Sequence, residues 1–88
     1  MMKFYPYLQE ALALTLEKLR KEKKMTKTKL ADFADLQDRY LLSISKGERN
    51  PSLRAIYSLC EALDVPVISF LDMVENERKR MLADGKNS

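Results

Sequence analysis

The chain has 88 residues, of which 45% are hydrophobic and 33% are charged, which fits one small soluble domain with a limited core. Two glycines and three prolines leave little room for a turn-rich all-β fold, and the lack of histidine with a single cysteine excludes histidine-based catalysis, histidine-ligated zinc and CxxC sites. The net charge of +3 is modestly basic, and no glycine-rich phosphate loop or paired carboxylates are present, so we expect no enzyme, metal or cofactor.

The first predicted helix covers about residues 6–23. Apolar or small side chains recur on one face at helical spacing: Leu8, Ala11, Leu12, Thr15, Leu16 and Leu19. Only Glu22 opposes a run of cations toward the end of this helix and beyond: Lys18, Arg20, Lys21, Lys23, Lys24, Lys27 and Lys29. Such a cluster alone is more often a solvated helix face, and the alternative is contact with phosphate groups.

The pattern of residues 26–52 predicts two short helices joined by a tight turn. Thr26 caps the first, about residues 27–33, and residues 34–36 form the turn. The second covers about residues 37–46 with Leu41 and Ile44 inward, and Gly47 follows where a left-handed residue is favoured. Because Ala31 is small, the helices can cross closely at nearly a right angle, which pushes the second outward, where it can enter a DNA major groove.

Two further helices complete an all-α, five-helix domain over residues 1–83. A helix over about residues 53–63 begins after the cap residue Ser52, and its apolar stripe is Leu53, Ile56, Cys60 and Leu63. Pro66 suits the first turn of the fifth helix. Residues 75–82 either extend that helix or form a sixth, and residues 84–88 are expected to fray.

The chain carries no sign of export or membrane insertion. Its first residues lack the apolar run of a signal peptide, and no apolar run approaches the roughly 18 residues that span a membrane. A single cysteine cannot form an internal disulfide, which agrees with a reducing compartment. We therefore expect a cytoplasmic protein without a membrane partner.

The tail of the two-helix motif carries the most specific pattern, Ile44-x-x-Gly47-x-Arg49-Asn50-Pro51-Ser52. With the flanking pattern over about residues 13–73, it resembles the helix-turn-helix of the phage-repressor and Cro type, the xenobiotic-response-element family. The resemblance implies a lambda-repressor-like DNA-binding domain with its recognition helix at about residues 37–46. It also implies a transcriptional regulator whose partner is double-stranded DNA.

By this resemblance, four side chains read bases: Gln37, Asp38, Arg39 and Ser43. Arg39 is the strongest candidate, because a guanidinium can bond guanine O6 and N7 together, unless it forms a salt bridge with Asp35 or Asp38. Gln37 either pairs with adenine or caps its own helix. Asp38 either accepts from cytosine or orients Arg39, and Ser43 can reach most bases.

Five residues are expected at DNA phosphates: Thr26, Lys27, Tyr40, Lys46 and Arg49. Lys27 stands at a helix N-terminus, where free backbone N–H groups already favour an anion. Lys46 either contacts phosphate or compensates the charge of its helix end, and both roles can hold. Tyr40 either packs under the helix or gives its hydroxyl to a phosphate.

Two departures from the family pattern stand out. Relatives often pair an arginine of the first helix with a glutamate, but the position that matches the glutamate is Ser45. Arg20 therefore bonds Ser45, finds another carboxylate or contacts DNA. Asp35 replaces a frequent glycine, and aspartate still permits the left-handed conformation.

Because Asp38 opposes phosphates and basic residues are few on the recognition helix, we expect weak half-site binding and hence a homodimer. Two copies would read a near-palindrome with half-sites about 34 Å apart. The predicted dimer surface lies on the fifth helix: Val67, Phe70, Leu71, Val74 and Met81. Some of these close the core instead, and the aromatic start is a second candidate surface: Phe4, Tyr5 and Tyr7.

The sequence thus predicts a sequence-specific DNA-binding transcriptional regulator, a dimeric repressor or autoregulator that reads a near-palindromic operator through the major groove. The alternative is a protein-interaction module on the same fold, for example one with antitoxin-like partner binding. The acidic Asp38 on the recognition helix is the feature that favours this alternative.

Overall fold

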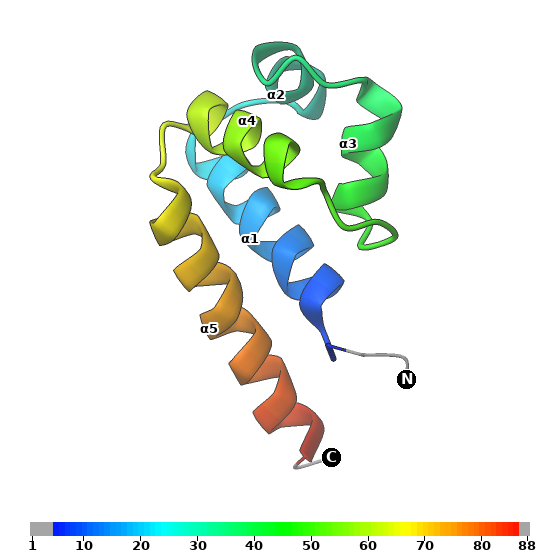
Figure 1. Ribbon diagram of the computed structural model, residues 1–88, viewed down its shortest axis with the longest axis vertical. Helices are drawn as coiled ribbons and strands as arrows, with labels where there is room; N and C mark the ends of the chain where they lie inside the picture. The colour runs from blue at the N-terminus through cyan, green and yellow to red at the C-terminus, as the bar shows by residue number, and fades with distance from the viewer. Residues whose placement is uncertain (1–4, 87–88) are drawn as a thin grey trace.

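The computed structural model describes residues 5–86. Over that range the chain consists of helices joined by turns and short irregular segments, without a strand (Figure 1). The five helices are α1 (Leu8–Glu22), α2 (Lys27–Phe33), α3 (Asp38–Ser45), α4 (Leu53–Leu63) and α5 (Val67–Lys86). The predicted all-α, five-helix architecture is confirmed.

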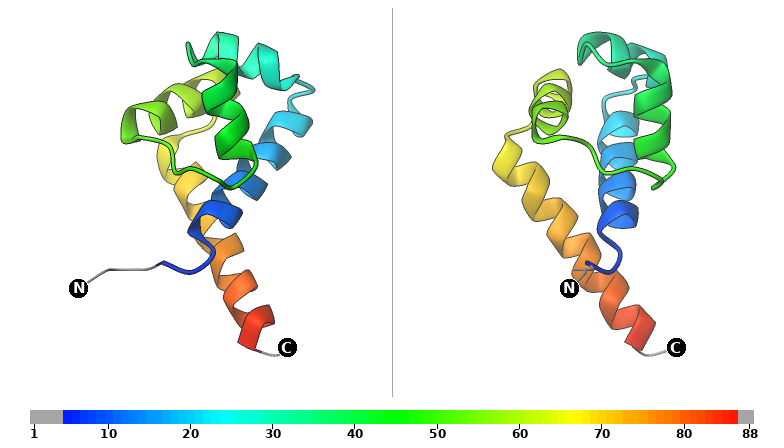
Figure 2. Two further views of the ribbon diagram at one scale, coloured as in Figure 1. Left: turned by 90° about the vertical axis from the view of Figure 1, so that its right-hand side faces the viewer. Right: turned by 45° about the vertical axis from the view of Figure 1, so that its right-hand side comes forward.

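Two long helices form the frame of the domain. α1 and α5 pack along each other, α4 lies across them, α2 lies beyond the C-terminal end of α1, and α3 runs beside α1 (Figures 1 and 2). Both ends of the described chain lie at the opposite end of the molecule from α2 (Figure 1). This arrangement leaves one long side of α3 without a neighbouring helix.

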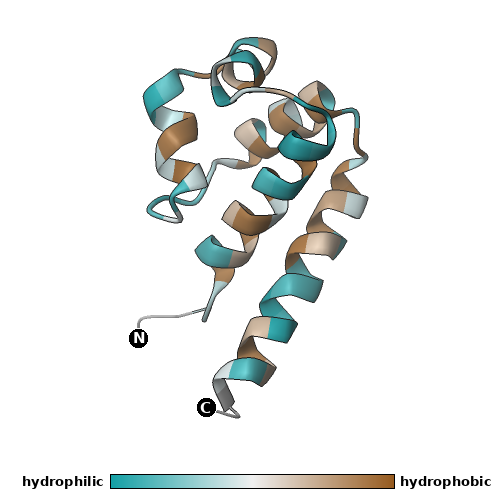
Figure 3. Ribbon diagram, turned by 180° about the vertical axis from the view of Figure 1, so that it is seen from behind, coloured by the Kyte–Doolittle hydropathy of each residue, from teal (hydrophilic) through white to brown (hydrophobic). Residues whose placement is uncertain are grey.

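The core is formed by one face of every helix. Apolar and polar segments alternate along α1 and α5, as amphipathic helices require (Figure 3). The predicted inward face of α1 is buried, except that Leu8 is half-buried. The largest fully buried side chains come from all five helices: Leu16, Leu30, Leu41, Ile44, Leu59, Leu63 and Phe70.

Local side-chain and backbone bonds define the helix ends as predicted. The hydroxyl of Thr26 accepts a hydrogen bond from the Lys29 N–H at 3.1 Å, and that of Ser52 accepts one from the Ala55 N–H at 3.1 Å. Such caps are worth about 1 kcal/mol each. Gly47 has a φ of +73° and ends α3 in the left-handed conformation that favours glycine.

The stripe predicted for α4 is partly wrong. Leu53 is 66% exposed, whereas Ala55 and Leu59 are buried beside Cys60 and Leu63. Leu53 stands in the first turn at the margin of the inward face, and Ala55 and Leu59 lie one turn apart at its centre. The small Ala55 permits close approach of the neighbouring backbone.

α5 is one continuous helix of 20 residues, so residues 75–82 extend it and form no sixth helix. Residues 84–86, expected in a frayed tail, continue the helix, while residues 87–88 lie outside the described residues. α5 continues through Gly85. A Cβ at this position would lie only 2.7 Å from the Tyr7 hydroxyl, so a larger residue there would require Tyr7 to move. Across residues 5–86, none of the helices combines the length and apolarity needed to cross a membrane.

Candidate nucleic-acid interface

The turn between α2 and α3 sets the direction of α3. Asp35 adopts the left-handed conformation with φ 56°, which aspartate permits in place of the usual glycine, and the Leu36 N–H bonds the Ala31 carbonyl at 2.8 Å. Ala31 and Ala34 are both buried, so small side chains stand beside Leu30 where α2 packs on its neighbours. Leu41 and Ile44 then bury one side of α3 and turn its opposite side to solvent.

The outward side of α3 carries the residues predicted to read bases. Gln37, Asp38 and Arg39 are exposed, and Ser43 is half-buried with its hydroxyl donating to the Tyr40 carbonyl at 2.7 Å. Gln37 occupies the cap position of α3, but its side chain makes no capping bond, so that alternative role is not realised.

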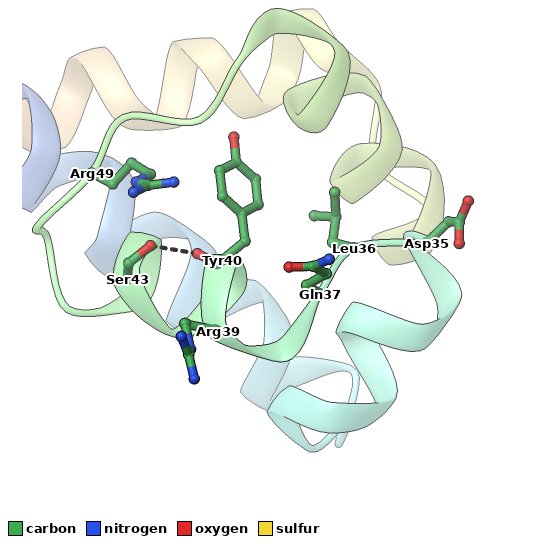
Figure 4. A pocket seen from close by; sticks show the side chains of 7 residues that line it. All are labelled: Asp35, Leu36, Gln37, Arg39, Tyr40, Ser43 and Arg49. Carbon is green, nitrogen blue, oxygen red and sulfur yellow. Dashed lines mark hydrogen bonds between the residues drawn. The ribbon is translucent and has the colours of Figure 1, made fainter.

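Arg39 remains available for a ligand. Among residues 5–86 its guanidinium has no ion-pair partner, so the alternative salt bridge to Asp35 or Asp38 is not formed. Figure 4 shows its side chain extending from α3 away from the Tyr40 ring. A solvated guanidinium on the outward side of α3 can bond two acceptors of one base.

A shallow hollow of about 390 Å³ runs beside α3 (Figure 4). It unites predicted base-reading and phosphate-binding residues with the turn before α3: Asp35, Leu36, Gln37, Arg39, Tyr40, Ser43 and Arg49. The tertiary structure therefore brings two predicted groups into one surface, although Asp38 lies outside this hollow on the other flank of α3.

Tyr40 connects α3 to the segment that follows it. Its hydroxyl accepts a hydrogen bond from the Ser52 N–H at 3.0 Å, and the Arg49 guanidinium carbon lies 5.6 Å from its ring centroid. A contact of this kind is worth about 0.5–1 kcal/mol at an exposed site. Tyr40 therefore packs against the loop that follows α3 and holds Arg49 beside α3.

A second cationic region lies at the start of α2. Thr26 and Lys27 are exposed there, and the Lys27 ammonium lies 3.5 Å from a carboxylate oxygen of Glu17 on α1. The Lys27 side chain is 46% exposed, so it can exchange this contact for a phosphate.

Arg20 pairs with the carboxylate of Glu17, which is one of its three expected roles. Its Nε bonds Glu17 at 2.6 Å and its Nη1 bonds the Met25 carbonyl at 2.6 Å, which ties the end of α1 to the start of α2. Burial disfavours the Glu17 carboxylate, but the hydrogen bond and charge of Arg20 and the charge of Lys27 outweigh it and lower the pKa of Glu17.

The cations thus flank α3 on both sides. Seen with α3 toward the viewer, the α1–α2 connection lies to one side and the loop after α3 to the other (Figure 2). Lys46, exposed at the C-cap of α3, and Arg49 belong to that loop, and Lys27 to the start of α2. An exposed helix between two cationic regions has the form required for a groove with phosphates on either rim.

A helix-turn-helix family model matches residues 16–70 of the chain. The chain belongs to the helix-turn-helix family. Within this family it is of the phage-repressor and Cro type, the helix-turn-helix of DNA-binding transcriptional regulators.

Known helix-turn-helix proteins share part of the sequence. The immunity repressor protein of Bacillus phage phi105 is 36% identical over 52 residues, which are 59% of this chain and 36% of the repressor. The chain therefore spans little more than a third of that relative. An uncharacterized HTH-type transcriptional regulator of Sinorhizobium fredii, y4dJ, is 29% identical over 58 residues, which are 66% of this chain and 75% of y4dJ.

Solved structures of helix-turn-helix regulators share the fold. The clp gene regulator ClgR from Corynebacterium glutamicum has a TM-score of 0.86 at 26% identity, covering 94% of this chain and 88% of that one. The restriction-modification controller protein C.Esp1396I, as a tetramer in complex with its natural 35 base-pair operator, has a TM-score of 0.75 at 26% identity. That match covers 82% of this chain and 95% of the controller chain.

The surface predicted to join two copies of this helix-turn-helix protein needs correction. Phe70 and Val74 are buried in the core of the single chain, because their side of α5 packs on α1, and they are not available to a partner. Val67 and Met81 are half-buried against the same core, and Leu71 is exposed. Of the alternative aromatic surface, Tyr5 and Tyr7 are exposed and Phe4 lies outside the described residues.

Two exposed apolar residues of this helix-turn-helix protein are not among the predicted site residues. Ile68 on α5 is 83% exposed, and Leu42 on α3 is 39% exposed. The apolar pattern of α5 does not by itself separate Ile68, on the outer face, from residues of the inner face such as Phe70. Leu42 follows Asp38 by four residues, and that spacing alone was sufficient to place it on the outward side of α3.

Proposed function

We propose that this helix-turn-helix protein is a sequence-specific regulator that acts as a cytoplasmic homodimer on a near-palindromic operator, as a repressor or autoregulator. The observation that carries the proposal is the outward side of α3, where Arg39 has no ion-pair partner among residues 5–86 and stands between cations on both flanks. The names of the phage immunity repressor and of the controller–operator complex support the same conclusion.

In the proposed complex α3 lies in the major groove. Arg39 bonds guanine O6 and N7, and Gln37 bonds adenine N6 and N7, because both side chains are exposed on the outward side of α3. Asp38 accepts from cytosine N4, and Ser43 contacts a neighbouring base edge. Each good bidentate pair contributes roughly 1–3 kcal/mol of discrimination.

Phosphates of the two strands contact the two cationic regions. Thr26 and Lys27 contact one strand, where the N-terminus of α2 adds its own partial positive charge. Lys46, Arg49 and the Tyr40 hydroxyl contact the other. These contacts position α3 but select no sequence.

The second copy is proposed to pack against the outer side of α5. Leu71 and Ile68 are exposed apolar residues of this helix, and Val67 and Met81 are half-buried. Two copies place two recognition helices on one face of the duplex, with half-sites about 34 Å apart.

Selection of bound DNA from a random duplex library, at low and at physiological salt, tests the proposal. We expect an enriched near-palindrome whose half-site spacing reports the dimer geometry, and a log–log salt dependence of several units. Enrichment of no sequence, with binding lost at physiological salt, would refute the proposal and favour a protein partner.

A further inference from the structure

Leu42 is an apolar side chain on the side of α3 that faces the groove. It is 39% exposed, whereas its neighbour Leu41 and Ile44 are buried in the core. On a helix, residues three and four apart share a face, so Leu42 stands one turn after Arg39 and Asp38 in the middle of the outward side. Every other residue proposed to face the bases is polar.

The surroundings of Leu42 place it near one rim of the groove. It lines a shallow hollow of about 230 Å³ with Lys27, Thr28 and Asp38. Asp38 is proposed to face a base and Lys27 a phosphate. Leu42 therefore lies between a base-reading position and the strand that Lys27 contacts.

The major-groove edges of the four bases carry one apolar substituent, the C5-methyl group of thymine. This methyl group projects from the part of the edge nearest its own sugar–phosphate backbone. An apolar side chain between base and backbone meets it, whereas the polar edges of guanine, adenine and cytosine would lose water to Leu42 without gaining a hydrogen bond.

We propose that Leu42 is a specificity-determining residue that packs on the C5-methyl group of one thymine in each half-site. The inference rests on the proposed function. It adds that one base of each half-site is a thymine, which Leu42 recognises by its methyl group.

The test replaces single methyl groups in the DNA. Starting from the duplex enriched by the full chain, each thymine of a half-site is changed in turn to deoxyuridine, which keeps every hydrogen-bonding group. Binding is measured by fluorescence anisotropy. We expect one replacement per half-site to weaken binding of the unaltered protein roughly fourfold, the effect of one buried methyl group.

Variants assign the effect to Leu42. Leu42→Ala should bind the thymine and deoxyuridine duplexes equally, while Leu42→Met, which keeps an apolar side chain, should retain the preference. Leu53→Ala makes the same truncation at an exposed leucine of α4 and should leave the thymine-to-deoxyuridine ratio unchanged. Thermal unfolding of each variant checks that the fold is intact.

The possible failures are distinguishable. If the protein binds its duplex specifically but no deoxyuridine replacement weakens it, or if Leu42→Ala keeps the thymine preference, the assignment of Leu42 is overturned and the proposed function stands. If no duplex is enriched at all, both are overturned.

Discussion

Phe70 and Leu71 are adjacent on α5, yet their truncation should have opposite consequences. Phe70 is fully buried, and Phe→Ala substitutions in cores cost about 3–5 kcal/mol. A domain of 88 residues has a free energy of unfolding of roughly 4–13 kcal/mol, so Phe70→Ala removes a large part of it. Leu71 is 42% exposed, and Leu71→Ala should cost about 1 kcal/mol in the single chain.

Truncation of Leu71 should weaken self-association more than a change at Phe70, the reverse of their effects on the stability of the single chain. Leu71→Ala removes an apolar group from the proposed dimer surface, so it should raise the dimer dissociation constant more than a core variant that still folds, such as Phe70→Leu. Urea unfolding followed by circular dichroism, at several protein concentrations, separates the two effects because association stabilises the folded chain by mass action. Sedimentation at the same concentrations gives the oligomeric state. If Phe70→Ala left the unfolding midpoint of the dilute protein unchanged and only weakened association, the placement of Phe70 in the core would be wrong.

Three further predictions concern single charges. Arg39→Ala should lose discrimination at one base pair of the selected site, and an unchanged sequence preference would contradict the proposed docking of α3. Lys27→Ala should weaken all duplexes about equally and lower the salt slope by about one, whereas Lys79→Ala, a matched charge loss on α5, should leave the slope unchanged. The lowered pKa of Glu17 stabilises the fold above the unfolded value of about 4.3 and loses this effect as pH falls through the folded pKa. Glu17→Gln should therefore be less stable than the unaltered protein at pH 7, by urea unfolding, with the difference vanishing in acid.

Much of the site was predictable because its spacing along the chain is short. α2 and α4 begin and end where the sequence placed them, since Thr26 and Ser52 each bond a backbone group only three residues away. The exposure of Asp38 and Arg39 follows from the inward positions of Leu41 and Ile44 on the same helix. The base-contact roles themselves remain predictions.

What the sequence could determine by itself was therefore the local structure: helices, the caps Thr26 and Ser52, the left-handed Gly47 and the helix-turn-helix pattern, because each depends on residues within about four positions of one another. Only the tertiary structure decided which side of α5 faces α1, so that Phe70 and Val74 belong to the core and Leu71 to the surface. It also decided that the Tyr40 hydroxyl accepts a hydrogen bond from the Ser52 N–H and that Tyr40 holds Arg49. An amphipathic pattern with apolar residues around much of a helix does not define the contact face, because that face depends on the shape of a partner distant in the chain.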